Sequence, residues 1–154
     1  MTPDSANLGV VRPPLIYLFS ILAGLALHFI WPLPLGFRTL STPLGIAIVI
    51  VATGLFVHSV RQLRGADTPV RANKPTTVIV QTGPYRFSRN PIYLAFSLLQ
   101  LGIAIWVDSL LVLGTLVIAV ALIACVVVPR EERYLERKFG ADYLRYKASV
   151  RRWV

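Results

Sequence analysis

The fold of this chain is decided by residues 91–128, which read PIYLAFSLLQLGIAIWVDSLLVLGTLVIAVALIACVVV. As a single helix this stretch would be about 57 Å long, roughly twice the ~30 Å hydrocarbon core of a bilayer. The polar interruption near its middle is Trp106-Val107-Asp108-Ser109. We therefore predict two membrane-spanning helices, at about 91–107 and 110–128, joined by a tight hairpin.

Two more apolar stretches precede this run. Residues 15–31 carry aromatic side chains near both ends, as helices anchored at membrane interfaces do. Residues 44–60 follow Pro43, and proline is favoured in the first turn of a helix. A cleaved signal peptide fits the first stretch poorly, because no small-residue cleavage site follows it. A soluble protein with buried helices is disfavoured by a mean hydropathy of +0.64 and only 15% charged residues.

The chain has 154 residues, which leaves room for a single domain spanning 1–154. We predict an all-α integral membrane protein with four transmembrane helices. Its 16 basic and seven acidic residues give a formal net charge of +9. Of the basic residues, only Arg38 lies on one side of the predicted membrane. The other fifteen lie on the opposite side, which the positive-inside rule makes cytoplasmic together with both termini. Anionic lipid headgroups or an anionic substrate are the expected partners, and nucleic acid is not.

Two polar segments face the cytoplasm in this topology. The first, residues 61–90, contains the β-branched run at 76–80 and the turn Thr82-Gly83-Pro84, which predict a partly extended loop. Asn90 precedes Pro91 and is expected to cap the third helix, whose first N–H groups favour an anion. The second segment is a tail with a break near Gly140. Its apolar stripe predicts an amphipathic helix, the alternative being an ordinary interfacial helix: Leu135, Phe139, Tyr143, Tyr146, Val150 and Trp153.

Several kinds of site are absent from the sequence. The glycines form neither G-x-G-x-x-G nor a P-loop, so a Rossmann dinucleotide site and a Walker nucleotide site are unsupported. Cys125 is the only cysteine, and His28 and His58 do not lie at metal-ligand spacing, so no metal site is predicted.

Polar residues instead gather near the ends of the predicted helices on the cytoplasmic side. Glu131 and Glu132 directly follow an apolar helix, where the helix dipole disfavours acidic residues. Either Arg130 and Arg133 neutralise them, or a carboxylate is needed there for a cationic ligand. From physics alone, the sequence indicates a pocket for a polar cofactor or a headgroup beneath four helices.

The same residues carry a resemblance. Gly83-Pro84-Tyr85-Arg86-Phe87-Ser88-Arg89-Asn90-Pro91-Ile92-Tyr93, an apolar hairpin, and then Glu131-Glu132-Arg133-Tyr134-Leu135, Phe139-Gly140, Tyr143 and Tyr146 resemble the isoprenylcysteine carboxyl methyltransferase family. Its wider relatives include membrane phospholipid methyltransferases. The resemblance covers roughly residues 64–154, and it is the combination of these pieces that is specific.

The resemblance implies S-adenosylmethionine as cofactor, with S-adenosylhomocysteine as product. It implies a cofactor site on the cytoplasmic side, within about 64–93 and 129–154, and a lipophilic acceptor that enters from the bilayer. An Arg-rich chain fits a bacterial member, and hence a bacterial inner membrane. Matching positions give these cofactor contacts: Thr77, Val78, Ile79, Val80, Tyr85, Asn90, Pro91, Ile92, Tyr93 and Glu131.

The implied reaction, in which an acceptor attacks the sulfonium methyl group in line, assigns further roles. Arg89 is expected to hold the cofactor carboxylate, and Glu132 or Tyr146 would act as base for an amine or thiol acceptor. Two positions depart from the family: its histidine is Asn90, which cannot titrate near pH 7, and a substrate-contacting arginine is replaced by Val127. Arg130 is the expected substitute for that arginine. These departures favour an acceptor other than a prenylcysteine carboxylate.

Two other classes of function stay open. A non-catalytic membrane scaffold or lipid-binding protein of the same fold is supported by Asn90 and Val127. A membrane reductase with a nicotinamide cofactor is the other alternative, against which the short chain and the acidic pair argue. The sequence does not identify the acceptor, the methylated atom or the oligomeric state.

Overall fold

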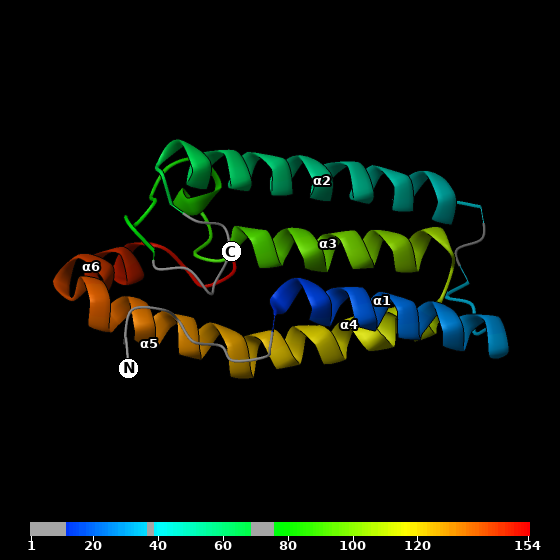
Figure 1. The fold of residues 1–154 in the computed structure, drawn as a ribbon. Helices are drawn as coiled ribbons and strands as arrows, with labels where there is room; N and C mark the ends of the chain where they lie inside the picture. Colours follow the sequence, from blue (N-terminus) through cyan, green and yellow to red (C-terminus); the bar gives the residue numbers. More distant parts are fainter. Residues whose placement is uncertain (1–11, 37–38, 69–75) are drawn as a thin grey trace.

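The computed structural model describes residues 12–36, 39–68 and 76–154 (Figure 1). Three of the basic residues used for orientation lie outside these ranges: Arg38, Arg71 and Lys74. The described residues form helices and no strand. In chain order these are α1 (Pro13–Ile30), α2 (Ser41–Gly65), the short 3-10 helix η1 (Gly83–Arg86), α3 (Pro91–Trp106), α4 (Leu110–Leu122), the π-helical turn η2 (Ile123–Val127), α5 (Val128–Phe139) and α6 (Ala141–Ser149).

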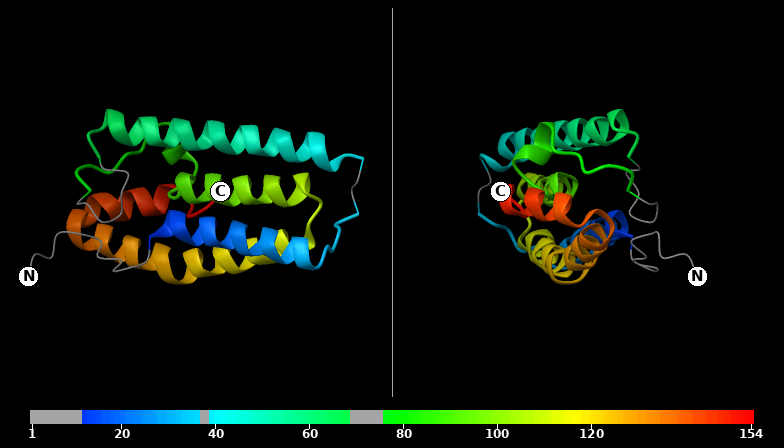
Figure 2. Two further views of the ribbon diagram at one scale, coloured as in Figure 1. Left: turned by 45° about the vertical axis from the view of Figure 1, so that its right-hand side comes forward. Right: turned by 90° about the vertical axis from the view of Figure 1, so that its left-hand side faces the viewer.

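The long helices lie side by side in one bundle. Helix α2 packs on α3, α1 packs on α4, and α3 also contacts α4. Figure 2 shows α4, η2 and α5 as one continuous helix that runs past the other helices, with α6 folded back against its end. The chain reverses direction at Gly140, whose φ of 52° suits glycine. The break predicted at this residue is confirmed.

Three helices are long and apolar enough to cross a membrane: Pro13–Ile30, Ser41–Gly65 and Leu110–Phe139. Helix α3 is apolar but has only 16 residues, about 24 Å at ~1.5 Å per residue. These helices support an integral membrane location, and they occupy the predicted stretches. The second extends beyond residue 60 to Gly65, so that Arg61 and Arg64 lie on it.

The hairpin between α3 and α4 lies where it was predicted. Asp108 turns the chain with a φ of 50°, and its Oδ1 accepts hydrogen bonds from the N–H groups of Leu35 at 3.1 Å and Gly36 at 3.2 Å. Ser109 then caps α4 by accepting a hydrogen bond from the N–H of Val112. The polar interruption therefore closes the hairpin and also holds the segment that follows α1.

A polar contact that the sequence analysis missed crosses the apolar part of the bundle. Gln100 of α3 is fully buried, and its Nε2 donates to Ser20 Oγ at 2.7 Å and to Thr115 Oγ1 at 3.2 Å. Its Oε1 is buried without a hydrogen-bond partner among the described residues. A glutamine inside an apolar run was the available signal, because polar side chains are costly in a membrane.

We expect that Gln100→Leu does not destabilise the protein. Ser20 Oγ donates to the carbonyl of Thr115 and Thr115 Oγ1 to that of Val112, so neither hydroxyl loses its acceptor when Gln100 is replaced. The unpaired amide oxygen disappears, and leaving such a group buried costs about 1–3 kcal/mol. The melting temperature in detergent should therefore stay unchanged or rise. A loss of more than about 2 kcal/mol would show instead that Gln100 holds the three helices together.

Candidate functional site

The predicted site residues converge where α3 begins and α5 leaves the bundle. Tyr93, in the first turn of α3, donates a hydrogen bond of 2.5 Å from its hydroxyl to Oε1 of Glu131. Glu131 does not lie at the C-terminal end of a helix, because the helix continues to Phe139. The expectation that the helix dipole disfavours the acidic pair is therefore wrong.

The carboxyl group of Glu131 is in an apolar environment. Burial raises its pKa to about 7, the hydrogen bond from Tyr93 opposes this shift, and the charge of Glu132 adds to it. The hydroxyl of Tyr93 is the hydrogen-bond partner found for it among the described residues, and it forms no ion pair there. Glu131 is thus a buried carboxyl group without a cation beside it.

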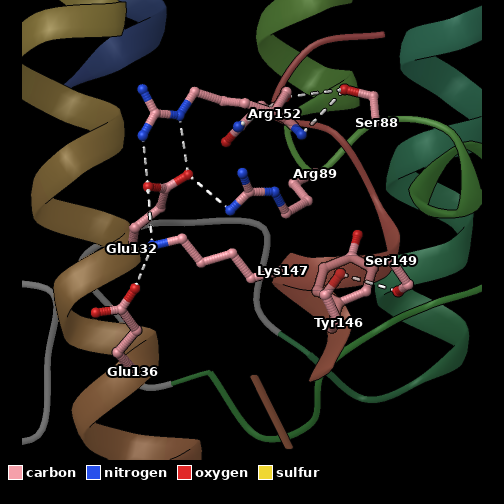
Figure 3. A network of polar contacts seen from close by, with 9 residues as sticks. Ser88, Arg89, Glu132, Glu136, Tyr146, Lys147, Ser149 and Arg152 are labelled. Carbon is pink, nitrogen blue, oxygen red and sulfur yellow. Dashed lines mark hydrogen bonds and ion pairs between the residues drawn. The ribbon is translucent and has the colours of Figure 1, made fainter. Parts of the chain in front are cut away.

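Its neighbour Glu132 is in the opposite situation. Figure 3 shows it among basic side chains: Arg89 Nη1 reaches Oε1 at 2.9 Å, and Arg152 binds both oxygens, at 3.0 Å from Nε and 2.7 Å from Nη2. Lys147 stands 4.0 Å away and also pairs with Glu136. The side chains of Glu132 and Arg89 are only 8% and 10% exposed. Both carboxylate oxygens of Glu132 are therefore occupied.

The C-terminal residues close over the start of α3. The N–H of Arg89 donates to the carbonyl of Arg151 at 3.0 Å, and Asn90 Nδ2 donates to the carbonyl of Arg152 at 3.0 Å. Asn90 stands at the N-cap position of α3, as predicted, but its side chain makes no capping hydrogen bond because it is turned to the tail. The first N–H groups of α3 are consequently left without a side-chain cap.

Three tyrosines form the buried wall beside this tail. Tyr85 of η1 and Tyr143 and Tyr146 of α6 are 8%, 2% and 5% exposed. The Tyr146 hydroxyl donates to the carbonyl of Tyr85 at 2.7 Å, which joins η1 to α6. Burial raises the pKa of all three phenols above its ordinary value, so they are uncharged.

The predicted run at 76–80 is irregular and forms no strand ladder among the described residues. Thr77 Oγ1 donates to the carbonyl of Asp67 at 2.9 Å, and the N–H of Thr76 donates to the hydroxyl of Tyr134 at 3.3 Å. These contacts join the end of α2 to α5. Val80 is buried, whereas the side chains of Thr77 and Val78 are exposed, Val78 to 52%.

The remaining predicted residues differ in how they are placed. Pro91 is buried at the start of α3, and Ile92 next to it is half-buried. Arg130 is exposed, while Val127 is 1% exposed in the apolar core with Ile123. The described residues contain no group of three side chains able to hold a metal ion.

Sequence reasoning missed the partners that complete the arrangement. Arg152 and Lys147 were counted only among the basic residues on the cytoplasmic side, and no sequence signal joined them to Glu132. Tyr17 of α1 was also missed. It is 1% exposed and its hydroxyl lies 2.8 Å from Ser97 Oγ and 3.3 Å from the carbonyl of Tyr93. A tyrosine within the first apolar stretch was the only hint.

Comparison with known proteins identifies the family of this chain. The family model of phospholipid methyltransferases matches residues 40–142, which include Tyr93 and Glu131. An uncharacterized protein of Haemophilus influenzae is 40% identical over 63 residues, which are 41% of this chain and 100% of that protein. No solved structure matches the chain significantly. Because the family model covers well over half of its residues, this chain belongs to the phospholipid methyltransferase family.

Proposed function

We propose that the protein transfers a methyl group from S-adenosylmethionine to a lipophilic acceptor at the cytoplasmic face of a bacterial inner membrane. Family membership supports methyl transfer at a membrane. The observation that carries the choice of cofactor is the buried carboxyl group of Glu131, which has the Tyr93 hydroxyl and no cation beside it. A ligand with a positive charge would supply the missing partner.

The groups around Glu131 fit such a cofactor. Glu131 would bind its amino or ribose end, and the uncapped N–H groups of Ile92 and Tyr93 would bind its carboxylate. The rings of Tyr85 and Tyr93 would pack on adenine or the sulfonium, since aromatic faces attract cations. The backbone of residues 77–80 remains a proposed contact. Arg89 is engaged by Glu132, so we assign it to shaping the site and not to holding the cofactor carboxylate.

When bound, this cofactor supplies a methyl group that an acceptor heteroatom attacks in line with the bond to sulfur. The chain's own contribution is to orient the acceptor and exclude water, because the methyl group needs no acid to leave. Glu132 and Tyr146 were predicted as bases, but ion pairs occupy the first and the second donates to Tyr85. We therefore propose structural roles for both.

The acceptor is proposed to be a lipid other than a prenylcysteine carboxylate. Val127 is buried in the core and Arg130 is exposed, so neither supplies the cation that a carboxylate acceptor needs beside Glu131. Membership of the isoprenylcysteine branch itself stays a proposal, as do the single domain over 1–154, the four spans and the cytoplasmic orientation.

Calorimetric titration of the detergent-purified protein tests the proposal. We expect saturable binding of S-adenosylmethionine and S-adenosylhomocysteine, and no binding of NADPH. Binding of NADPH alone would indicate a reductase. A folded protein that binds none of the three would be a scaffold, and the proposed function would be wrong.

A further inference from the structure

The helix that carries Glu131 is not regular along its length. The N–H of Val128 bonds to the carbonyl of Ile123, five residues earlier, and residues Ile123–Val127 form a π turn. A π turn accommodates one residue more than the same length of α-helix. Everything after it is therefore rotated relative to the helix before it.

This rotation decides which side chains face α3. The buried residues of α4, together with the first residue of η2, form one stripe: Val112, Leu116, Ala119 and Ile123. At about 100° per residue, a regular helix would bring Arg130 to within about 20° of Ile123 on that stripe, and would turn Glu132 to the opposite side. The structure shows the reverse arrangement. Arg130 is exposed, Glu132 is 6% exposed, and Glu131 contacts Tyr93.

Pro129 gives a local cause for the π turn. Proline has no N–H, and in a regular helix its ring would clash with the carbonyl four residues earlier, that of Cys125. Cys125 is exposed and lies within the turn, where the widened backbone removes this clash. The residue that breaks the helical pattern thus stands directly before Arg130 and the acidic pair.

We propose that Pro129 is a positioning residue of the cofactor site: through the π turn it directs Glu131 and Glu132, in place of Arg130, toward the start of α3. The cofactor part of this inference rests on the proposed function. The inference about the direction of these side chains rests on the hydrogen bond from Val128 to Ile123 and on how far Arg130, Glu131 and Glu132 are exposed.

Two variants separate the effect of the helix register, meaning which of residues 130–132 faces the bundle, from a general effect of losing the proline. In Pro129→Ala the π turn is no longer required, and a regular helix would turn Arg130 inward. Deleting Cys125 as well removes the surplus residue, so a regular helix then brings Glu131 back to its native direction. Because Cys125 is exposed, its deletion removes no core side chain.

The direction in which residue 130 points is measured on the detergent-purified protein, with one cysteine at position 130 and a water-soluble maleimide. Cys125 is the only native cysteine, so Cys125→Ser gives a clean background. We expect fast labelling of Arg130→Cys in this background and about tenfold slower labelling after Pro129→Ala. Fast labelling should return when residue 125 is deleted. The affinity for S-adenosylhomocysteine, measured without the cysteine at 130, should fall about tenfold and recover in the same order.

Unchanged labelling in a folded Pro129→Ala variant would overturn the proposal, as would slow labelling that the deletion does not reverse. If Pro129→Ala does not fold, one alanine inserted between Pro129 and Arg130 turns Arg130 inward while keeping the proline, and it must protect the same cysteine. Because labelling needs no ligand, the register is tested even if the native protein binds no adenosyl compound. A native protein that binds no adenosyl compound would overturn the proposed function and the assignment of Pro129 to a cofactor site.

Discussion

Glu132→Ala is expected to lower the free energy of unfolding by about 3–5 kcal/mol, the range found when one partner of a buried ion pair is removed. The loss comes from Arg89, whose side chain is 10% exposed and would keep its charge without a counter-ion. Arg152 and Lys147 are 39% and 37% exposed, so water can solvate them and their share is small. Thermal and denaturant unfolding in detergent would measure the loss.

Glu136→Ala is the matched control for this variant. Glu136 is one turn further along α5 and pairs with Lys147, but both side chains are about one third exposed, at 31% and 37%. An exposed pair contributes at most about 1 kcal/mol. The double replacement Arg89→Met with Glu132→Leu should recover most of the loss, because no buried charge then remains. If the two alanine variants lower the free energy of unfolding equally, the ion pairs of Glu132 with Arg89 and Arg152 are not the main contact between α5 and the start of α3.

Glu131→Gln is expected to weaken cofactor binding roughly ten- to a hundredfold without unfolding the protein. Glutamine keeps the shape and can accept the hydrogen bond from Tyr93, but it removes the charge offered to a cationic ligand. Hydrogen bonds to charged groups are worth about 1.5–3 kcal/mol, which corresponds to this loss of affinity. Calorimetric titration with S-adenosylmethionine would measure it, with Arg130→Gln as an exposed control expected to bind normally.

The pH dependence of the protein's stability and of its affinity for the cofactor follows from the raised pKa of Glu131. Its folded-state pKa is about 7, against 4.5 for the free group, so its contribution to stability is complete below about 4.5 and is lost as the pH rises to about 7. At about pH 8 the glutamine variant should therefore melt higher than the native protein. The native affinity should fall between about pH 8 and 6, as the carboxylate becomes protonated, and the variant should show no such fall. Equal affinities at both pH values in the native protein would remove Glu131 from the site.

The helical framework was predictable from local pattern. The length of the apolar run at 91–128 exceeds one crossing, so the chain had to fold back, and Asp108 and Ser109 were the polar residues available for the turn. Gly140 marked the second reversal because glycine adopts a positive φ without strain. The convergence of Tyr93 and Glu131 followed from a motif resemblance, and the structure brings them within hydrogen-bonding distance.

The hydrogen-bond and ion-pair partners of the site residues could not be predicted from the local sequence pattern. Asn90 occupies its expected position, yet whether its amide caps α3 or bonds to Arg152 depends on where a segment 62 residues later returns. Glu131 and Glu132 are adjacent and chemically alike in the sequence. One becomes a carboxyl group without a cation and the other the centre of an ion-pair cluster, because they point about 100° apart on the helix.

The sequence by itself determined which stretches form apolar helices and where the chain reverses, because these depend on apolar length, proline and glycine within a few residues. Only the tertiary structure decided which face of α5 meets α3. That face depends on a single extra residue in the π turn and on contacts from α1, α3 and the C-terminal tail. A rotation of about 100° leaves local composition unchanged, but it exchanges Arg130 for Glu131 in the site.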